Sequence, residues 1–192
     1  MPRPADPASA ALRLLDDLGA TTADHPGGTL GAHLRRVQQQ LAHWGARPAL
    51  QLAGLCHAFY GTDGFAMAPL PHGDRSRLVE VIGTEAESIV HFYASCDRAA
   101  TYPTLADAGA VFRDRFTGRT FTPTLQQRKD FTELTAANEL DIARVDADFR
   151  KKWGGELLAL FTRLQSLLSP RAWQDCETVL APPGPGPRLT PR

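Results

Sequence analysis

Polar side chains occupy positions where the helical pattern of this sequence favours apolar ones. His33 lies three residues after Leu30 and four before Val37, in a segment whose apolar residues recur every three or four positions. Side chains at these spacings share one face of a helix, so His33 borders a buried face. His57 has the same place in the most apolar segment of the chain. Both imidazoles are candidates for a site that transfers protons, because histidine titrates near neutral pH.

Two more polar residues interrupt a later helical pattern. Leu134, Asn138, Asp141 and Val145 recur at spacings of 4, 3 and 4 residues, which places the amide and the carboxylate on an inward face. Burying a hydrogen-bonding group without a partner costs about 1–3 kcal/mol. Polar residues from three helices can satisfy one another around one cavity that holds a metal ion, a substrate or water. The alternative, in which each histidine bonds a core carbonyl separately, stays open.

Periodicity and turn residues predict helices over most of the chain. The expected helical ranges are 7–18, 30–44, 48–60, 75–82, 85–97, 125–145, 155–168 and 170–181. A small β-hairpin is expected between Phe112 and Phe121, with its turn at Thr117-Gly118. The glycine-rich segments 21–28 and 60–65 are expected to be a loop and a turn. The sequence therefore predicts an all-α fold with one small hairpin.

The domain organisation follows from the same patterns. Residues 1–181 are expected to form a single domain, since their length and composition suit one hydrophobic core. Residues 182–192 are rich in proline and glycine and are expected to be a disordered tail.

Composition and charge exclude several classes of protein. The 21 basic and 21 acidic residues cancel, so neither nucleic acid nor an anionic membrane surface is an expected partner. The apolar stretches are too short to span a bilayer, and the first residues lack the apolar core of a signal peptide. Three widely spaced cysteines predict neither a disulfide framework nor a CxxC metal site. We expect a cytoplasmic protein with a small-molecule substrate; a homodimer is left open.

Several segments resemble the HD-domain superfamily of helical metal-dependent phosphohydrolases and di-iron oxygenases. The resembling segments are Thr29–Leu34, Ala53–Phe65, Ile82–Glu87 and Ala137–Leu140. The segment Ala53–Phe65 looks like an uncharacterised bacterial branch of that superfamily. The resemblance implies an HD-like helical bundle for small-molecule metabolism, with His33 and His57 on successive helices and Asn138 or Asp141 on a late helix.

The chain departs from the HD pattern at two metal-ligand positions. An aspartate should follow the second histidine, where this chain has Ala58, and the final aspartate falls at Asn138. A divalent ion normally takes at least three protein ligands and prefers negative charge among them. Iron, manganese or zinc is therefore expected only if Asp141 joins His33 and His57. Asp63 and His91 are the other candidate ligands.

The preferred interpretation is an enzyme that needs no metal. His57 is its general acid/base, and His33 and Tyr60 complete the catalytic group. The residues expected to bind substrate are Thr62, Asp63, Asn138 and Asp97. An isomerisation, elimination or condensation of a small metabolite suits this set. Two alternatives remain: a metal-dependent phosphohydrolase or di-iron oxygenase with rearranged ligands, and a non-catalytic small-molecule-binding or interaction module.

A group of arginines surrounds the predicted hairpin. It consists of Arg98, Arg113, Arg115 and Arg119. Guanidinium groups bind carboxylate and phosphate through paired N–H donors, so the group is a candidate site for an anion. A solvated surface is the other interpretation.

Overall fold

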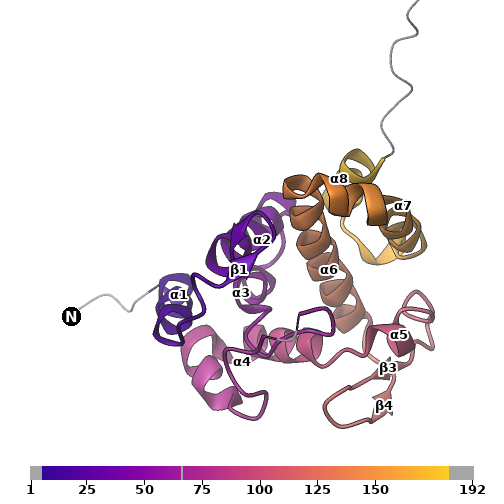
Figure 1. Ribbon diagram of the computed structural model, residues 1–192. Coiled ribbons are helices and arrows are strands. Elements are labelled where there is room, and N and C mark those ends of the chain that lie inside the picture. Colours follow the sequence, from indigo (N-terminus) through magenta and orange to yellow (C-terminus); the bar gives the residue numbers. More distant parts are fainter. Residues whose placement is uncertain (1–5, 66, 182–192) are drawn as a thin grey trace, which may run out of the picture.

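The computed structural model describes residues 6–65 and 67–181, and nearly all of their regular structure is helical (Figure 1). The helices are α1 (Pro7–Asp17), α2 (Leu30–Trp44), α3 (Pro48–Cys56), α4 (Arg75–Ala94), α5 (Arg98–Thr101), α6 (Leu125–Val145), α7 (Ala147–Arg163) and α8 (Pro170–Leu180), with a 3₁₀ turn at Gln165–Leu167. Two antiparallel pairs of short strands join them: β1 (Asp24–His25) with β2 (Gly28–Thr29), and β3 (Phe112–Arg113) with β4 (Thr120–Phe121). The predicted all-α fold with a small hairpin is confirmed.

Helix α6 is the central element of the fold. It begins with a capping box, in which the Thr124 hydroxyl accepts from the Gln127 backbone while the Gln127 side chain accepts from the Thr124 backbone. The helix packs against α2, α3 and α4 in the first half of the chain and against α7 and α8 in the second (Figure 1). Residues buried on α6 therefore face partners from most of the molecule.

Helices α2 and α3 pack closely at a glycine. A Cβ atom added to Gly54 would lie 2.5 Å from the Cδ1 atom of Leu41, so a larger residue there would require the Leu41 side chain to move. His33 lies on α2, and His57 follows the last residue of α3. This close approach sets how near the two imidazoles come.

The boundaries of two predicted helices were wrong. Helix α3 was expected to reach Tyr60 but ends at Cys56, because the chain tightens into i→i+3 turns before Gly61, whose φ is 66°. Helix α7 was expected to begin at Gly155 but begins at Ala147, where the Asp146 carboxylate caps the backbone N–H of Phe149.

Helix α4 joins two segments that were expected to be separate helices. They meet at Gly83, whose φ of 81° and ψ of 160° are not helical. Two helical segments therefore meet at a kink at Gly83, which is the position that the sequence predicted for the break. This conformation is open almost only to glycine.

The segment expected to be the loop 21–28 contains the β1–β2 hairpin. Asp24 pairs with Thr29 and His25 with Gly28, so Pro26 and Gly27 form the turn between them. The hairpin places the imidazole of His25 beside α2, where it stacks on the ring of His33.

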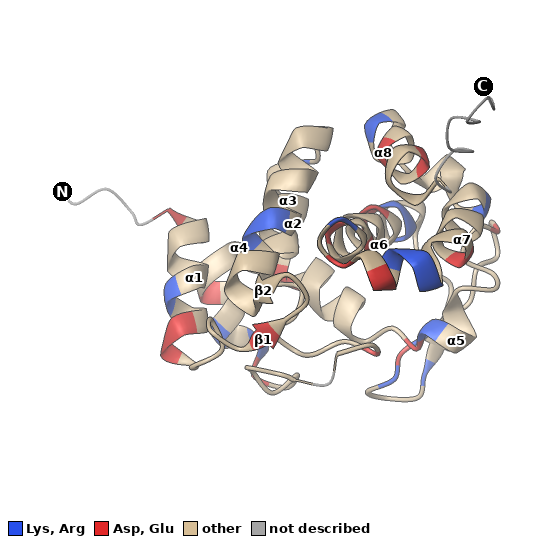
Figure 2. Cartoon of the chain, turned by 45° about the horizontal axis from the view of Figure 1, so that its top comes forward, with Lys and Arg blue, Asp and Glu red and all other residues tan. Residues whose placement is uncertain are grey.

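Charged residues of both signs lie along α6, α7 and α8 (Figure 2). Among the described residues, no helix combines the length and the hydrophobicity needed to cross a bilayer. The expected disordered tail, residues 182–192, lies outside the described part of the chain.

Candidate functional site

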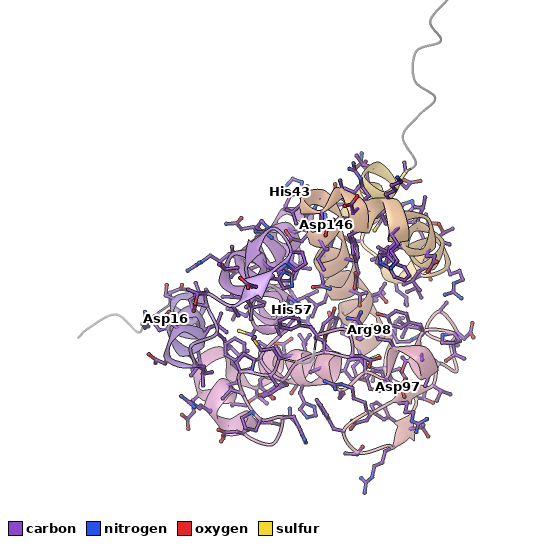
Figure 3. All side chains as sticks on the ribbon, in the orientation of Figure 1. Asp16, His43, His57, Asp97, Arg98 and Asp146 are labelled. Atoms are coloured by element: carbon purple, nitrogen blue, oxygen red, sulfur yellow. The ribbon has the colours of Figure 1, made fainter. Side chains whose placement is uncertain are left out.

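The structure brings His33, His57 and Asn138 to one point in the interior. The Nε2 atoms of His33 and His57 are 3.4 Å apart, and the Oδ1 atom of Asn138 lies 3.0 Å from Nε2 of His33. His33 is fully buried, and His57 and Asn138 are 3% and 9% exposed. Figure 3 shows His57 in the middle of the molecule. The three polar groups come from α2, from the end of α3 and from α6.

A backbone carbonyl fixes the proton on one nitrogen of His57. The Nδ1 atom lies 2.8 Å from the carbonyl oxygen of Gly54, which can only accept a hydrogen bond. The last carbonyls of a helix have no helical donors, and α3 ends at Cys56. Nδ1 therefore carries the proton of the neutral ring, and Nε2 has a lone pair directed at His33.

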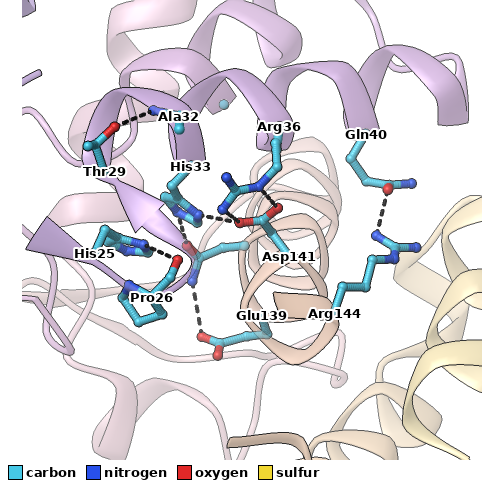
Figure 4. A network of polar contacts seen from close by, with 12 residues as sticks. His25, Pro26, Thr29, Ala32, His33, Arg36, Gln40, Glu139, Asp141 and Arg144 are labelled. Atoms are coloured by element: carbon cyan, nitrogen blue, oxygen red, sulfur yellow. Dashed lines mark hydrogen bonds and ion pairs between the residues drawn. The ribbon is translucent and has the colours of Figure 1, made fainter. Parts of the chain in front are cut away.

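A carboxylate fixes the proton on Nδ1 of His33. That atom lies 2.7 Å from Oδ2 of Asp141, which also accepts from Nε and Nη2 of Arg36 at 2.7 and 2.9 Å through its two oxygens (Figure 4). A carboxylate only accepts, so Nδ1 of His33 is a donor. The Nε2 atom of His33 faces the other two polar groups.

The three atoms at the centre are all acceptors when both rings are neutral. The amide nitrogen of Asn138 donates to Oε1 of Glu139 at 3.2 Å, which turns its Oδ1 atom toward His33. Lone pairs of two imidazoles and one amide then converge with no hydrogen between them. A proton on Nε2 of His33 removes the conflict, since that N–H can donate to Asn138 and His57. The hydrogen-bond geometry therefore favours one extra proton shared by the two imidazoles.

The ionisation of the neighbouring groups is consistent with that pattern. Burial, together with the nearby His33, lowers the pKa of His57 from 6.5 to about 3, so this ring is the neutral member of the pair at pH 7. Burial by itself raises the pKa of Asp141, but the hydrogen bonds from His33 and Arg36 outweigh burial and keep that pKa below its ordinary value. An ionised Asp141 stabilises a positive charge on the ring of His33.

A cavity of about 330 Å³, called here the histidine cavity, opens beside the imidazole pair. His57, Thr62 and Asn138 lie in its wall, and His33 lies behind them. The remaining lining residues are His25, Pro26, Leu30, Ala58, Gly64, Phe65, Arg98, Glu139, Ile142 and Phe149. His57 is therefore the member of the pair that a bound molecule would touch.

Asp63 and Asp97, two of the predicted substrate-binding residues, do not line the histidine cavity. The carboxylate of Asp63 is exposed and accepts from the backbone N–H of Arg98 at 3.0 Å. The carboxylate of Asp97 caps α5 by accepting from the backbone of Ala100 and lies 3.6 Å from Arg113. Both acidic side chains hold the start of α5 in place.

Tyr60, expected beside His57, lies in a different polar cluster. Its hydroxyl donates to Oε1 of Glu87 at 2.9 Å, and its ring contacts His91 rather than the histidine cavity. Burial and the hydrogen bond to Glu87 raise the pKa of Tyr60, so its hydroxyl keeps its proton. The reason is geometric: α3 ends before Tyr60, and the following turns point it toward α4.

The residues do not fit an HD-type divalent metal centre. Asp141 contacts Nδ1 of His33, so it lies on the opposite side of that ring from Nε2 of His57. The atoms that do converge are two imidazole nitrogens and one amide oxygen, with no carboxylate. Within residues 6–65 and 67–181, no three histidine, cysteine or acidic side chains are arranged to hold a metal ion. The proposed set of His33, His57 and Asp141 is therefore not one coordination sphere.

Two residues of the site were not predicted from the sequence. His25 stacks on His33 with ring centroids 3.9 Å apart, and burial together with the nearby His33 lowers its pKa to about 4. Glu139 is 8% exposed and accepts from Asn138 and, at 3.3 Å, from Arg98. The pair Pro26-Gly27 is a signal for the turn that positions His25, whereas no spacing distinguishes Glu139 from a surface acid.

Comparison with known proteins gives one family match. A family model described as "Domain of unknown function (DUF6817)" matches residues 14–98. No curated protein and no solved structure matches the chain. The matched segment contains His25, His33, His57 and Arg98, and it ends before α6, which supplies Asn138, Glu139 and Asp141. This chain is thus similar to that domain over the segment that carries all the imidazoles of the site.

Proposed function

We propose that this protein is an enzyme of small-molecule metabolism in which His57 is the general acid/base and no metal is obligatory. The observation that carries the proposal is the convergence of two imidazole Nε2 atoms, both with Nδ1 fixed as a donor, beside a cavity that His57 lines. A proton held between two rings can be given to a bound molecule and taken back, which is the role of a general acid/base.

Each residue of the cluster has a distinct part in this proposal. His57 lies in the cavity wall and exchanges the proton with the substrate at Nε2, because its Nδ1 donates to the Gly54 carbonyl. His33 supplies and recovers that proton, and the carboxylate of Asp141 stabilises the positive charge of His33 while this ring holds the proton. Asn138 is a positioning residue, since its amide nitrogen is directed at Glu139 and its oxygen at His33. An isomerisation, elimination or condensation needs this kind of proton transfer.

The test starts from a mixture of metabolites, because the substrate is unidentified. Wild-type protein, His57→Gln and His33→Gln are incubated with a metabolite extract, and mass spectrometry records which compounds disappear or change. The wild type is expected to convert at least one compound, and each variant to do so about 100-fold to 10,000-fold more slowly. His43→Gln, which changes an exposed histidine, is the matched control. Undiminished turnover in both site variants would contradict the proposal.

Two further measurements separate the alternatives. Elemental analysis of the purified protein is expected to find far less than one transition-metal ion per chain; about one iron, manganese or zinc would favour the metal-dependent phosphohydrolase or oxygenase. A compound that stabilises the protein in a thermal-shift screen but is never converted would favour the non-catalytic binding module.

The HD-like relationship and its bacterial branch are part of the proposal. The HD-like relationship is supported by the meeting of His33, His57 and Asn138 from two successive helices and a late one, and the bacterial branch stays a prediction. A cytoplasmic location is supported by three cysteines that are all free and buried. The net charge of zero supports a small-molecule partner over nucleic acid. A homodimer stays a prediction, which light scattering can check.

A further inference from the structure

A second cavity lies next to the histidine cavity and shares part of its wall. Its volume is about 460 Å³, and Arg98, Glu139 and Phe149 line both cavities. The ion pair between Arg98 and Glu139, with an Nη1 to Oε1 distance of 3.3 Å, thus belongs to the boundary between the two spaces. A molecule larger than the histidine cavity would extend past this ion pair.

The second cavity is called here the aromatic cavity because of its lining. Tyr102, Phe149, Trp153, Leu157 and Leu160 give it a mostly apolar wall from α7 and from the end of α5. Trp153 is 38% exposed although it is among the largest apolar residues of the chain. An exposed tryptophan beside an apolar hollow is typical of a ligand site.

The guanidinium of Arg98 has N–H donors without a strong hydrogen bond at this boundary. Its guanidinium contacts only Glu139 at 3.3 Å and the hydroxyl of Tyr93 at 3.4 Å among the described side chains. Charge-assisted hydrogen bonds are normally about 2.7–2.9 Å long, and a guanidinium has five N–H donors. Arg98 can therefore accept a planar anion without first breaking a strong bond. The side chain of Arg98 is 25% exposed, whereas Arg113 of the same predicted cluster is 53% exposed and pairs with Asp97.

A neighbouring hydroxyl also lacks a partner. The Oη atom of Tyr102 is buried and makes no hydrogen bond with any described residue. Tyr102 lines the aromatic cavity together with Arg98. A ligand oxygen that reached this hydroxyl from the aromatic cavity would give it an acceptor, in addition to the guanidinium donors.

We infer that the substrate is a small amphipathic carboxylic acid whose carboxylate binds Arg98 and whose apolar body occupies the aromatic cavity. The inference rests on the proposed function, because it places the reacting part of the molecule in the histidine cavity, against His57. A single carboxylate suits the site better than a doubly charged phosphate, since Glu139 lies beside the same guanidinium. The planar fork of arginine matches a carboxylate through two parallel hydrogen bonds.

Phenylacetate and octanoate are suitable probes, with phenylacetamide and octanamide as neutral counterparts. Titration calorimetry is expected to show saturable millimolar or tighter binding of at least one acid and about tenfold or more weaker binding of its amide. Equal affinity for acid and amide would overturn the inference. So would the absence of saturable binding of both acids up to about 10 mM.

Variants locate the two parts of the site. Arg98→Gln is expected to weaken binding of the acid about tenfold or more, and Arg98→Lys to restore part of it. Trp153→Ala is expected to weaken binding of acid and amide alike, because it removes apolar contact only. Arg119, which is exposed and lines neither cavity, supplies the matched control: Arg119→Gln should leave binding unchanged. Arg163 is the other arginine that lines the aromatic cavity. Binding that depends on Arg163 and not on Arg98 would overturn the inference.

The same titration separates this inference from the proposed function. His57→Gln is expected to bind the acids as the wild type does, since His57 contacts the reacting part only. If the acids fail to bind while His57 is needed for turnover, the substrate class is wrong and the proton-transfer function stands. If the acids bind through Arg98 while the histidine variants keep full turnover, the inferred carboxylate site at Arg98 is correct and the proposed function is wrong.

Discussion

At the scale of single residues, the account depends on what each nitrogen of the imidazole pair contacts. Asp141 and the Gly54 carbonyl fix both Nδ1 atoms as donors, so the Nε2 atoms are left to face each other. This arrangement makes the carboxylate of Asp141 the group that allows His33 to hold a positive charge in the interior. It also makes the buried His57 the neutral ring.

Replacing Asp141 tests the first of these statements. Asp141→Asn is expected to destabilise the fold by about 1–3 kcal/mol at pH 7, since the buried donors of His33 and Arg36 lose an ionised acceptor. The pKa of Asp141 is lowered in the native state, so its contribution is complete above about pH 4 and declines as the pH falls through the native pKa. Urea denaturation at pH 7 and pH 3 measures both effects. The exposed Asp16→Asn is the control; an equal, pH-independent loss in both variants would contradict the role of Asp141.

Acid unfolding tests the neutral state of His57. Its native pKa of about 3 lies below the ordinary value of 6.5, so between these values only the unfolded chain binds the proton. Stability is therefore expected to fall as the pH is lowered from 6.5 to 4, by about 1.4 kcal/mol per pH unit for this one group. Urea titrations measure the free energy of unfolding at each pH. The pH dependence due to His57 should be lost in His57→Gln and kept in His43→Gln. An unchanged slope in His57→Gln would mean that His57 accepts a proton in the native state.

The sequence predicted part of the site at this scale. His33, His57 and Asn138 were predictable because each interrupts an apolar face. The contact of Asp141 with Nδ1 of His33 could not be predicted. Helical spacing indicates that the Asp141 side chain faces inward, but it does not indicate which ring nitrogen the carboxylate contacts. The prediction for Tyr60 was wrong because α3 ends before this residue. Glu139 could not be predicted, since the sequence does not distinguish a buried acidic residue from an exposed one.

At the scale of elements, backbone breaks decide where the functional side chains lie. The end of α3 at Cys56 allows the imidazole of His57 to reach back to the Gly54 carbonyl. The break of α4 at Gly83 was predicted in place, because glycine within a helical pattern has few other uses. The start of α7 was not predicted correctly, because the cap at Asp146 stands before a stretch without apolar periodicity, and the glycines at 154 and 155 favour a helix boundary there.

Two glycine substitutions with opposite expected signs test the break in α4. Gly83→Ala is expected to cost about 1–3 kcal/mol, because its φ of 81° and ψ of 160° are strained for any residue with a Cβ atom, although nothing lies within 4 Å of that atom. Gly155→Ala, in the exposed interior of α7 with equally open space, is expected to stabilise by about 1 kcal/mol. Thermal and urea unfolding measure both. A neutral Gly83→Ala would show that α4 runs straight.

At the scale of the whole molecule, the site needs both halves of the chain. The segment that matches the family model supplies three imidazoles and Arg98, and α6 supplies the amide and the two carboxylates around them. The all-α class could be predicted from periodicity alone, because it requires only the spacing of apolar residues. The two adjoining cavities could not be, since they depend on how α7 and the end of α5 close over α6.

The most direct test of the central claim is the protonation of the two rings, read from histidine ¹⁵N chemical shifts at pH 7 and assigned with His33→Gln and His57→Gln. The account predicts that His33 carries protons on both nitrogens and that His57 carries one, on Nδ1. Two neutral rings, or a His57 ring protonated only on Nε2, would contradict it.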